Sequence, residues 1–327
     1  MKRMQLLLML IPFGVLAQLK SITSKKPSLI QSITSDVNNG KFNQVVFNYD
    51  ENNRVIAIIN KEIHKESDNI KKSKLIEEII KEQIFQYSDN GLQPLSRKTT
   101  SYIPNSANSN KNKRFVVEYI EQQSFIYENG ERIGDSSIYI KNWQQQLDWD
   151  WKTAEPQLRV GKLEKASERI YHEIDLTKPY SPPTKYINEF SLISLSNIGK
   201  DASSYRWANN ANEATYYTFN AFDTFLNPLK QLNIAKTLVN EKISSEFGGQ
   251  YGKTDINWYF FNQNNYTDYT VTTNEQSQHY KYIFQFRYTY NQFKQPVHAK
   301  VQVKQVYNKG GKLVRVYKQG FTFRYNK

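Results

Sequence analysis

Residues 45–59 read VVFNYDENNRVIAII, and this segment indicates the fold class of the chain. Apolar and polar side chains alternate at Phe47-Asn48-Tyr49, the run Asp50–Asn53 is polar, and Arg54–Ile59 is mostly apolar. Successive side chains of a β-strand point to opposite faces, and Asn and Asp favour tight turns. The segment therefore predicts a β-hairpin.

The same arrangement of strand, polar turn and strand recurs along the chain. Within strands the period is two, since Phe284 and Phe286 alternate with Gln285 and Arg287. Such alternation is typical of an antiparallel sheet with one packed face and one face in water. We therefore predict a mainly β protein, an extended antiparallel β-meander of hairpins. Its further turns are expected at Ser88–Gly91, Glu128–Glu131, Asn262–Asn265, Tyr290–Phe293 and Asn308–Gly311.

Two segments depart from this rhythm. Leu229, Leu232, Ala235 and Val239 have helical spacing, so we expect a helical insert at about 226–247, ending before Gly248-Gly249. Residues 74–82 fit either a helix face or a long strand. Their direct continuation into Phe85-Gln86-Tyr87 favours the strand.

The proline-rich run Pro179–Pro183 is the best candidate for a linker. It would divide an N-terminal antiparallel β region, residues 18–183, from a C-terminal β-meander, residues 184–327. One continuous sheet is the alternative.

The first seventeen residues have the layout of a secretory signal peptide. Lys2 and Arg3 precede an apolar run to Leu16, and Val15-Leu16-Ala17 fits a cleavage site. We predict that residues 1–17 are removed and that the protein is exported, periplasmic or extracellular, and not integral to a membrane. The chain contains no cysteine, so disulfides and thiolate chemistry are excluded.

The formal net charge is +13. An exported basic protein could meet anionic polysaccharide, lipid headgroups or nucleic acid. No long block of Lys and Arg occurs, and the densest groups, Lys71–Lys74 and Lys111–Arg114, resemble exposed turns. We therefore expect the charge to be spread over a lysine-rich surface. The expected partners are envelope polysaccharide, lipid or protein, and no nucleic acid.

The sequence carries no catalytic signature. The four histidines, His64, His172, His279 and His298, are far apart, and none has metal-ligand spacing to another. Neither a serine-hydrolase elbow nor a glycine-rich phosphate loop occurs. We predict no metal, no cofactor and no enzymatic activity.

One segment could bind a ligand. Asp148 and Asp150 would share one face of a strand, with Trp149 and Trp151 on the other and Trp143 nearby. Tryptophans beside carboxylates suit sugar rings, and two carboxylates suffice for a glycosidase. The alternative is an amphipathic strand whose tryptophans pack into the sheet.

The repeated pattern of an aromatic residue, any residue and Tyr before a polar turn resembles the YD-type (Rhs-like) repeat. Phe47–Val55 is its best copy, with looser copies at Phe85–Gly91 and Tyr288–Phe293. From Tyr217 to the closing Phe323-Arg324-Tyr325, the chain resembles YD-like β-meander proteins exported by Bacteroidetes, a DUF4595-like group. The resemblance implies an envelope location and an antiparallel sheet, and it transfers no catalytic residue.

These observations predict an exported, non-catalytic envelope protein that binds or scaffolds through a broad sheet face. One alternative is a carrier that holds a lipid or lipoprotein tail in an open sheet wrapped round the predicted helix. Another is a glycan-active enzyme that uses Asp148 or Asp150.

Overall fold

The structure is a computed structural model. It describes residues 28–37, 40–67, 73–104, 115–142, 158–160, 204–210, 213–238, 241–245, 255–260, 262–273, 280–307 and 309–326. The predicted signal peptide, residues 1–17, and the predicted linker Pro179–Pro183 lie outside these ranges.

Within the described ranges, nearly all regular structure is strand. The strands of the N-terminal half are β1 (Ile30–Ser35), β2 (Lys41–Tyr49), β3 (Val55–Ser67), β4 (Ser73–Gln86), β5 (Ser96–Pro104), β6 (Phe115–Glu128), β7 (Glu131–Asn142) and β8 (Leu158–Val160). Those of the C-terminal half are β9 (Ser204–Asn210), β10 (Glu213–Leu226), β11 (Lys242–Ser245), β12 (Ile256–Tyr259), β13 (Asn264–Thr273), β14 (Tyr280–Tyr290), β15 (Pro296–Tyr307) and β16 (Leu313–Tyr325). No helix in the described ranges is both long enough and apolar enough to cross a membrane.

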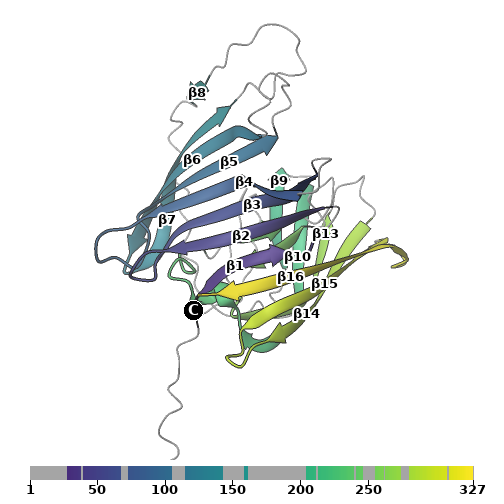
Figure 1. Ribbon diagram of the computed structural model, residues 1–327. Helices are drawn as coiled ribbons and strands as arrows, with labels where there is room; N and C mark the ends of the chain where they lie inside the picture. The colour runs from purple at the N-terminus through teal and green to yellow at the C-terminus, as the bar shows by residue number, and fades with distance from the viewer. Residues whose placement is uncertain are drawn as a thin grey trace, which may run out of the picture.

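Fourteen of these strands form one antiparallel sheet in the order β8-β7-β6-β5-β4-β3-β2-β1-β16-β15-β14-β13-β10-β9. The first and last described strands meet at its centre, where Ile33 of β1 is opposite Phe323 of β16. In Figure 1 the sheet bends, so that β14–β16 turn away from the plane of β2–β6. The predicted mainly β, antiparallel meander is confirmed, and one continuous sheet joins the two halves of the chain.

The core lies on the inner face of the bend. Phe284 and Phe286 are buried there, whereas Arg287, which follows Phe286, is exposed on the outer face. The separate two-stranded sheet of β11 and β12 packs against this core. Its Trp258 meets Phe286 and Phe323 edge-on, with ring centroids 5.7 and 5.2 Å apart. Edge-to-face contacts of this kind add to the stabilisation from apolar burial.

Four hairpins close with the same pair of aromatic residues. A buried Phe lies two positions before a Tyr whose hydroxyl donates to a backbone carbonyl at or just before the start of the preceding strand. We call this hydrogen bond a tyrosine latch. The latches run from Tyr49 to Ile30 O, Tyr87 to Val55 O, Tyr127 to Pro94 O and Tyr325 to Pro296 O, with oxygen–oxygen distances of 2.5, 2.6, 2.7 and 2.8 Å.

The latches explain why the aromatic-x-Tyr pattern recurs. A buried tyrosine needs a hydrogen-bond partner for its hydroxyl, and the carbonyls beside the strand starts provide one. Burial raises the pKa of Tyr87 to about 12, so the hydroxyl stays protonated and can donate. Each latch ties the two ends of one hairpin together and thereby fixes its register.

The predicted helical insert is mainly irregular. It contains one turn of 3-10 helix, Pro228–Gln231, whose N-cap Asn227 accepts from the Leu229 amide at 3.0 Å. The backbone of Leu232 is already extended, and turns continue to Leu238. The buried residues of this segment include Ile234, which would lie on a different side of an α-helix from Leu229. The burial therefore does not follow one helical stripe, and the apolar spacing does not produce an α-helix.

Two further predictions about local structure have different outcomes. Residues 74–82 belong to the long strand β4, as their continuation into Phe85 indicated. The expected hairpin around Asn262–Asn265 is wrong, because β12 pairs with β11 whereas β13 pairs with β10 and β14. The alternating pattern identified both strands but could not identify their partners.

Removal of one latch should destabilise the fold measurably. In Tyr325→Phe the Pro296 carbonyl loses its donor, and we expect the free energy of unfolding to fall by about 1 kcal/mol. Chemical denaturation measures this loss. The control is Tyr307→Phe, at a residue of β15 that is 39% exposed and whose hydroxyl interacts with the side chain of Tyr280. This change should alter stability by less than about 0.5 kcal/mol. Equal effects at the two positions would contradict a structural role for the latch.

A partly buried ion pair fastens the irregular segment to the inner face of the sheet. Arg97 of β5 donates to the Glu241 carboxylate and, at 2.6 Å, to the side-chain oxygen of Gln123. Burial alone would raise the pKa of Glu241, but the charge and hydrogen bond of Arg97 outweigh it and lower this pKa below its ordinary value. Burial also lowers the pKa of the adjacent Lys242, to about 8.

The lowered pKa of Glu241 makes its contribution to stability depend on pH. The unfolded chain binds this proton more readily, so the stabilisation is complete above the unfolded pKa and is lost as pH falls through the folded pKa. Glu241→Gln should therefore be less stable than the wild type at pH 7, and the difference should shrink towards pH 3. Thermal unfolding between these pH values measures it. Glu51→Gln, which removes a negative charge from an exposed turn, serves as the control.

Candidate functional site

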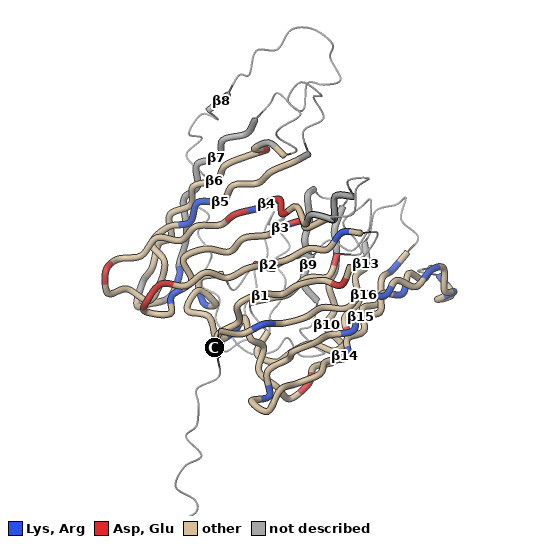
Figure 2. The backbone as a smooth tube through the Cα atoms, in the orientation of Figure 1, with Lys and Arg blue, Asp and Glu red and all other residues tan. Residues whose placement is uncertain are grey.

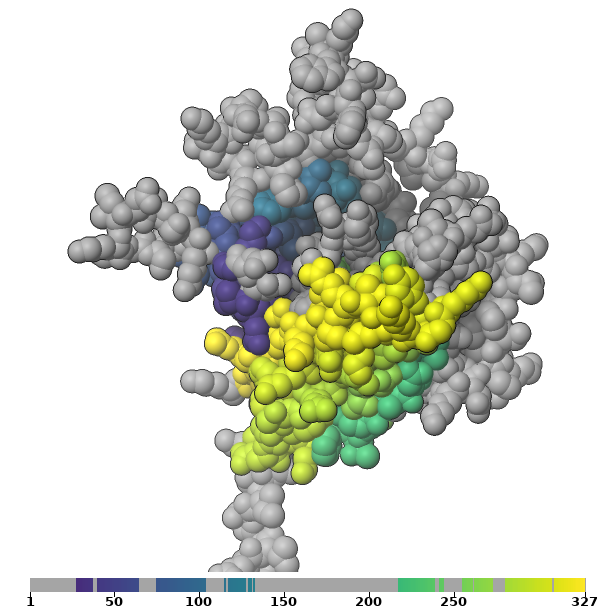
Figure 3. Space-filling model, turned by 90° about the vertical axis from the view of Figure 1, so that its right-hand side faces the viewer, coloured from purple at the N-terminus to yellow at the C-terminus, as the bar shows by residue number. Residues whose placement is uncertain are grey.

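An open cleft lies on the outer face of the C-terminal strands. Its volume is about 910 Å³, and it lies over β13–β16 and the residues that follow β1. We call it the C-terminal cleft and define it by its six charged or titratable lining residues, Asp36, Asp268, Arg287, His298, Lys300 and Lys318. Figure 3 looks onto the side of the molecule where β14–β16 form one continuous surface.

Three cations on adjacent strands line the cleft. Arg287 of β14 is directly opposite Lys300 of β15, and Lys318 of β16 is opposite Gln302, the next residue of β15 on this face. All three cationic side chains are exposed, and none takes part in the ion pairs found among the described residues. Like charges directly opposite each other in a sheet are destabilising. An anion bound between them would relieve this repulsion.

Two acidic residues line the same cleft. Asp268 of β13 accepts from the amides of Asn220 and Gln285, at 2.6 and 3.3 Å. Asp36 lies over Gly320, where an added Cβ would come 1.9 Å from its Oδ2 atom. Gly320 therefore leaves room for the Asp36 carboxylate. Because Gly320 is directly opposite Lys300, this carboxylate lies beside the cations, and the three cations exceed the two carboxylates of the cleft by one charge.

The cations of the cleft belong to a wider imbalance in the sequence. Residues 276–327 contain 11 Lys and Arg and no Asp or Glu, which accounts for +11 of the net charge of +13. The other 275 residues carry 33 basic and 31 acidic side chains, a net +2. Figure 2 shows basic positions along the arm formed by β15 and β16. The excess charge is therefore concentrated in the C-terminal strands, and the expectation of an evenly spread charge is wrong.

No contiguous block of basic residues marks this site in the sequence. On a strand, cations that share a face are separated by at least one residue, and cations on neighbouring strands are more than ten residues apart in the sequence. A signal was nevertheless present, because the last acidic residue of the chain is Glu275. The site predicted at Trp143, Asp148, Trp149, Asp150 and Trp151 lies outside the described residues.

Comparisons with known proteins give a distant likeness. No family model matches the sequence, and no curated protein matches it. Among solved structures, the chain is similar to a porin-like protein from Bacteroides uniformis, with 9% identity and a TM-score of 0.36. The match covers 92% of this chain and 98% of that protein. The resemblance to the YD-type repeat stays a prediction.

Proposed function

We propose that this chain is an exported, non-catalytic binding protein of the cell envelope, and that its C-terminal cleft binds an anionic polysaccharide. The proposal depends chiefly on the three exposed cations, Arg287, Lys300 and Lys318, which are adjacent across three strands. Cations that outnumber the acidic side chains of a cleft raise the local concentration of anions and strengthen their binding.

The remaining lining residues favour a polar polymer over a lipid. Thr267, Gln285, Gln302 and Gln319 offer amide and hydroxyl groups beside the cations. Such groups can hydrogen-bond sugar hydroxyls while the cations bind the carboxylates or sulfates of the same chain. The cleft is open to solvent and crosses several strands, which suits an extended ligand.

The described core argues against the carrier alternative. A lipid carrier needs an apolar concave surface that its own side chains leave empty. Here the inner face is filled by aromatic side chains such as Phe219, Trp258 and Tyr269, which are at most 5% exposed. The enzymatic alternative depends on Asp148 and Asp150, which lie outside the described residues.

The proposal predicts salt-sensitive binding of polyanions that depends on the cleft. Heparin and polygalacturonate serve as sulfated and carboxylated probes, and uncharged dextran serves as the negative control. We expect Lys300→Gln/Lys318→Gln to weaken heparin binding at least fivefold at about 0.1 M salt, where charges beyond about 10 Å are screened. Isothermal titration calorimetry at several salt concentrations measures this change and the expected shallower salt dependence.

The matched control removes the same charge from another surface. Lys98→Gln/Lys236→Gln neutralises two exposed lysines on β5 and in the irregular segment. It should change the affinity less than twofold. If both double variants weaken binding equally, net charge and not the cleft determines binding, and the proposal fails. It also fails if dextran competes as well as the polyanions do.

A further inference from the structure

We propose a divalent transition-metal site, of the kind that Zn²⁺ occupies, at Glu62, His64 and Glu78. These residues lie on β3 and β4, away from the C-terminal cleft. One ligand atom from each lies within 4.8 Å of the others. The proposal is independent of polysaccharide binding.

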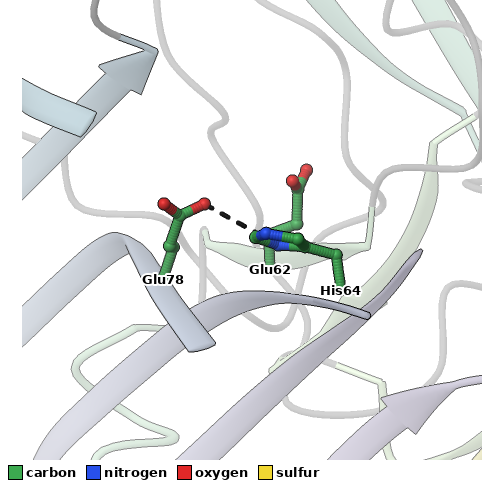
Figure 4. A group of neighbouring side chains, drawn as sticks. All are labelled: Glu62, His64 and Glu78. Atoms are coloured by element: carbon green, nitrogen blue, oxygen red, sulfur yellow. Dashed lines mark ion pairs between the residues drawn. The ribbon is translucent and has the colours of Figure 1, made fainter. Parts of the chain in front are cut away.

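Strand geometry brings the three side chains together. Glu62 and His64 are two residues apart on β3 and therefore share a face. Glu78 is directly opposite Glu62 on β4, which places it diagonally across from His64. Figure 4 shows Glu78 reaching towards His64 from the neighbouring strand, and the imidazole Nδ1 lies 3.9 Å from Glu78 Oε2.

The cluster is largely shielded from water. The side chains of Glu62, His64 and Glu78 are 20%, 11% and 14% exposed. Two adjacent carboxylates repel each other, and the repulsion grows as they leave water. A dipositive ion between them would remove this repulsion and would bind the imidazole nitrogen as well.

One imidazole and two carboxylates are a ligand set that first-row divalent metals accept. Zn²⁺ binds imidazole nitrogen and carboxylate oxygen at about 2.0–2.2 Å. Ligand atoms round one ion are then roughly 3–3.5 Å apart, so the cluster must contract by about 1–1.5 Å. Rotations of the two glutamate side chains can provide this movement. Three protein ligands leave a coordination position for water.

A lysine competes for one of the ligands. The Lys41 amine lies 3.0 Å from Glu62 Oε1, but half of the Lys41 side chain is exposed. Surface ion pairs of this kind contribute about 0–1 kcal/mol, so a metal ion can displace the lysine at little cost.

Metal binding to the full folded chain tests the proposal. After treatment with a chelator and exchange into chelator-free buffer, the chain is titrated with ZnCl₂ in a calorimeter. We expect one Zn²⁺ per chain, with the affinity reduced at least tenfold by Glu78→Gln and by His64→Ala. In the wild type, Co²⁺ as a spectroscopic probe should develop visible absorption bands that both variants lack.

Two controls separate this site from unspecific binding. Glu77→Gln changes the adjacent β4 residue on the opposite face, which pairs with Lys61 at 2.8 Å, and it should leave the Zn²⁺ affinity within twofold. His298→Ala removes a histidine of the C-terminal cleft and should also leave the affinity unchanged.

The Zn²⁺ titrations of the wild type and the two variants can support or overturn the proposed metal site. Absence of a saturable site, or a site that persists in both Glu78→Gln and His64→Ala, would overturn it. Circular dichroism checks that each variant is folded. Should His64→Ala not fold, the near-isosteric Glu78→Gln alone decides, because it keeps the shape and removes the charge.

Discussion

The hydrogen bond between a tyrosine hydroxyl and the carbonyl beside a strand start is the constraint on which this sheet depends. The chain has no cysteine, so no covalent link fixes any pair of strands. A slip of one residue would bring every core aromatic to the outer face. In a latch, the buried Phe specifies which face is packed, and the Tyr two residues later specifies the register. Phe323 and Tyr325 do this in β16, the strand that joins the last part of the chain to β1.

With register fixed by aromatic residues on the inner face, the outer face can carry residues that do not stabilise the sheet. Arg287 opposite Lys300 is such a pair, because the two like charges repel across adjacent strands. On the inner face beneath them, Phe286 and Val301 are also directly opposite each other and are 4% and 2% exposed. Packing on one face thus compensates for repulsion on the other. Local rules of this kind are commonly broken at functional sites.

The sequence predicted the hairpins well because strand and turn signals are local. Phe47–Val55 specifies a strand end, a turn and a strand start within nine residues. Partners are not local. The pairing of β12 with β11, and the meeting of β1 with β16, depend on contacts that no sequence window contains. For the same reason, the sequence alone did not predict the C-terminal cleft or the cluster at His64. Neither cluster has a motif spacing, because each is assembled across strands, and the cluster at His64 takes its third member from β4.

The inner face carries two groups of charges that differ in how they are neutralised. Glu241 is held by the guanidinium of Arg97, which is 6% exposed and also bound to Gln123. A fixed, fully charged donor of this kind satisfies a partly buried carboxylate without any further ion. Glu62 faces the amine of Lys41, whose side chain is half exposed, and Glu78 lies 3.9 Å from the imidazole of His64. Neither contact is an ion pair with a fixed guanidinium. An aqueous cation can therefore compete at the second group but not at the first, although both lie on the same face of one sheet.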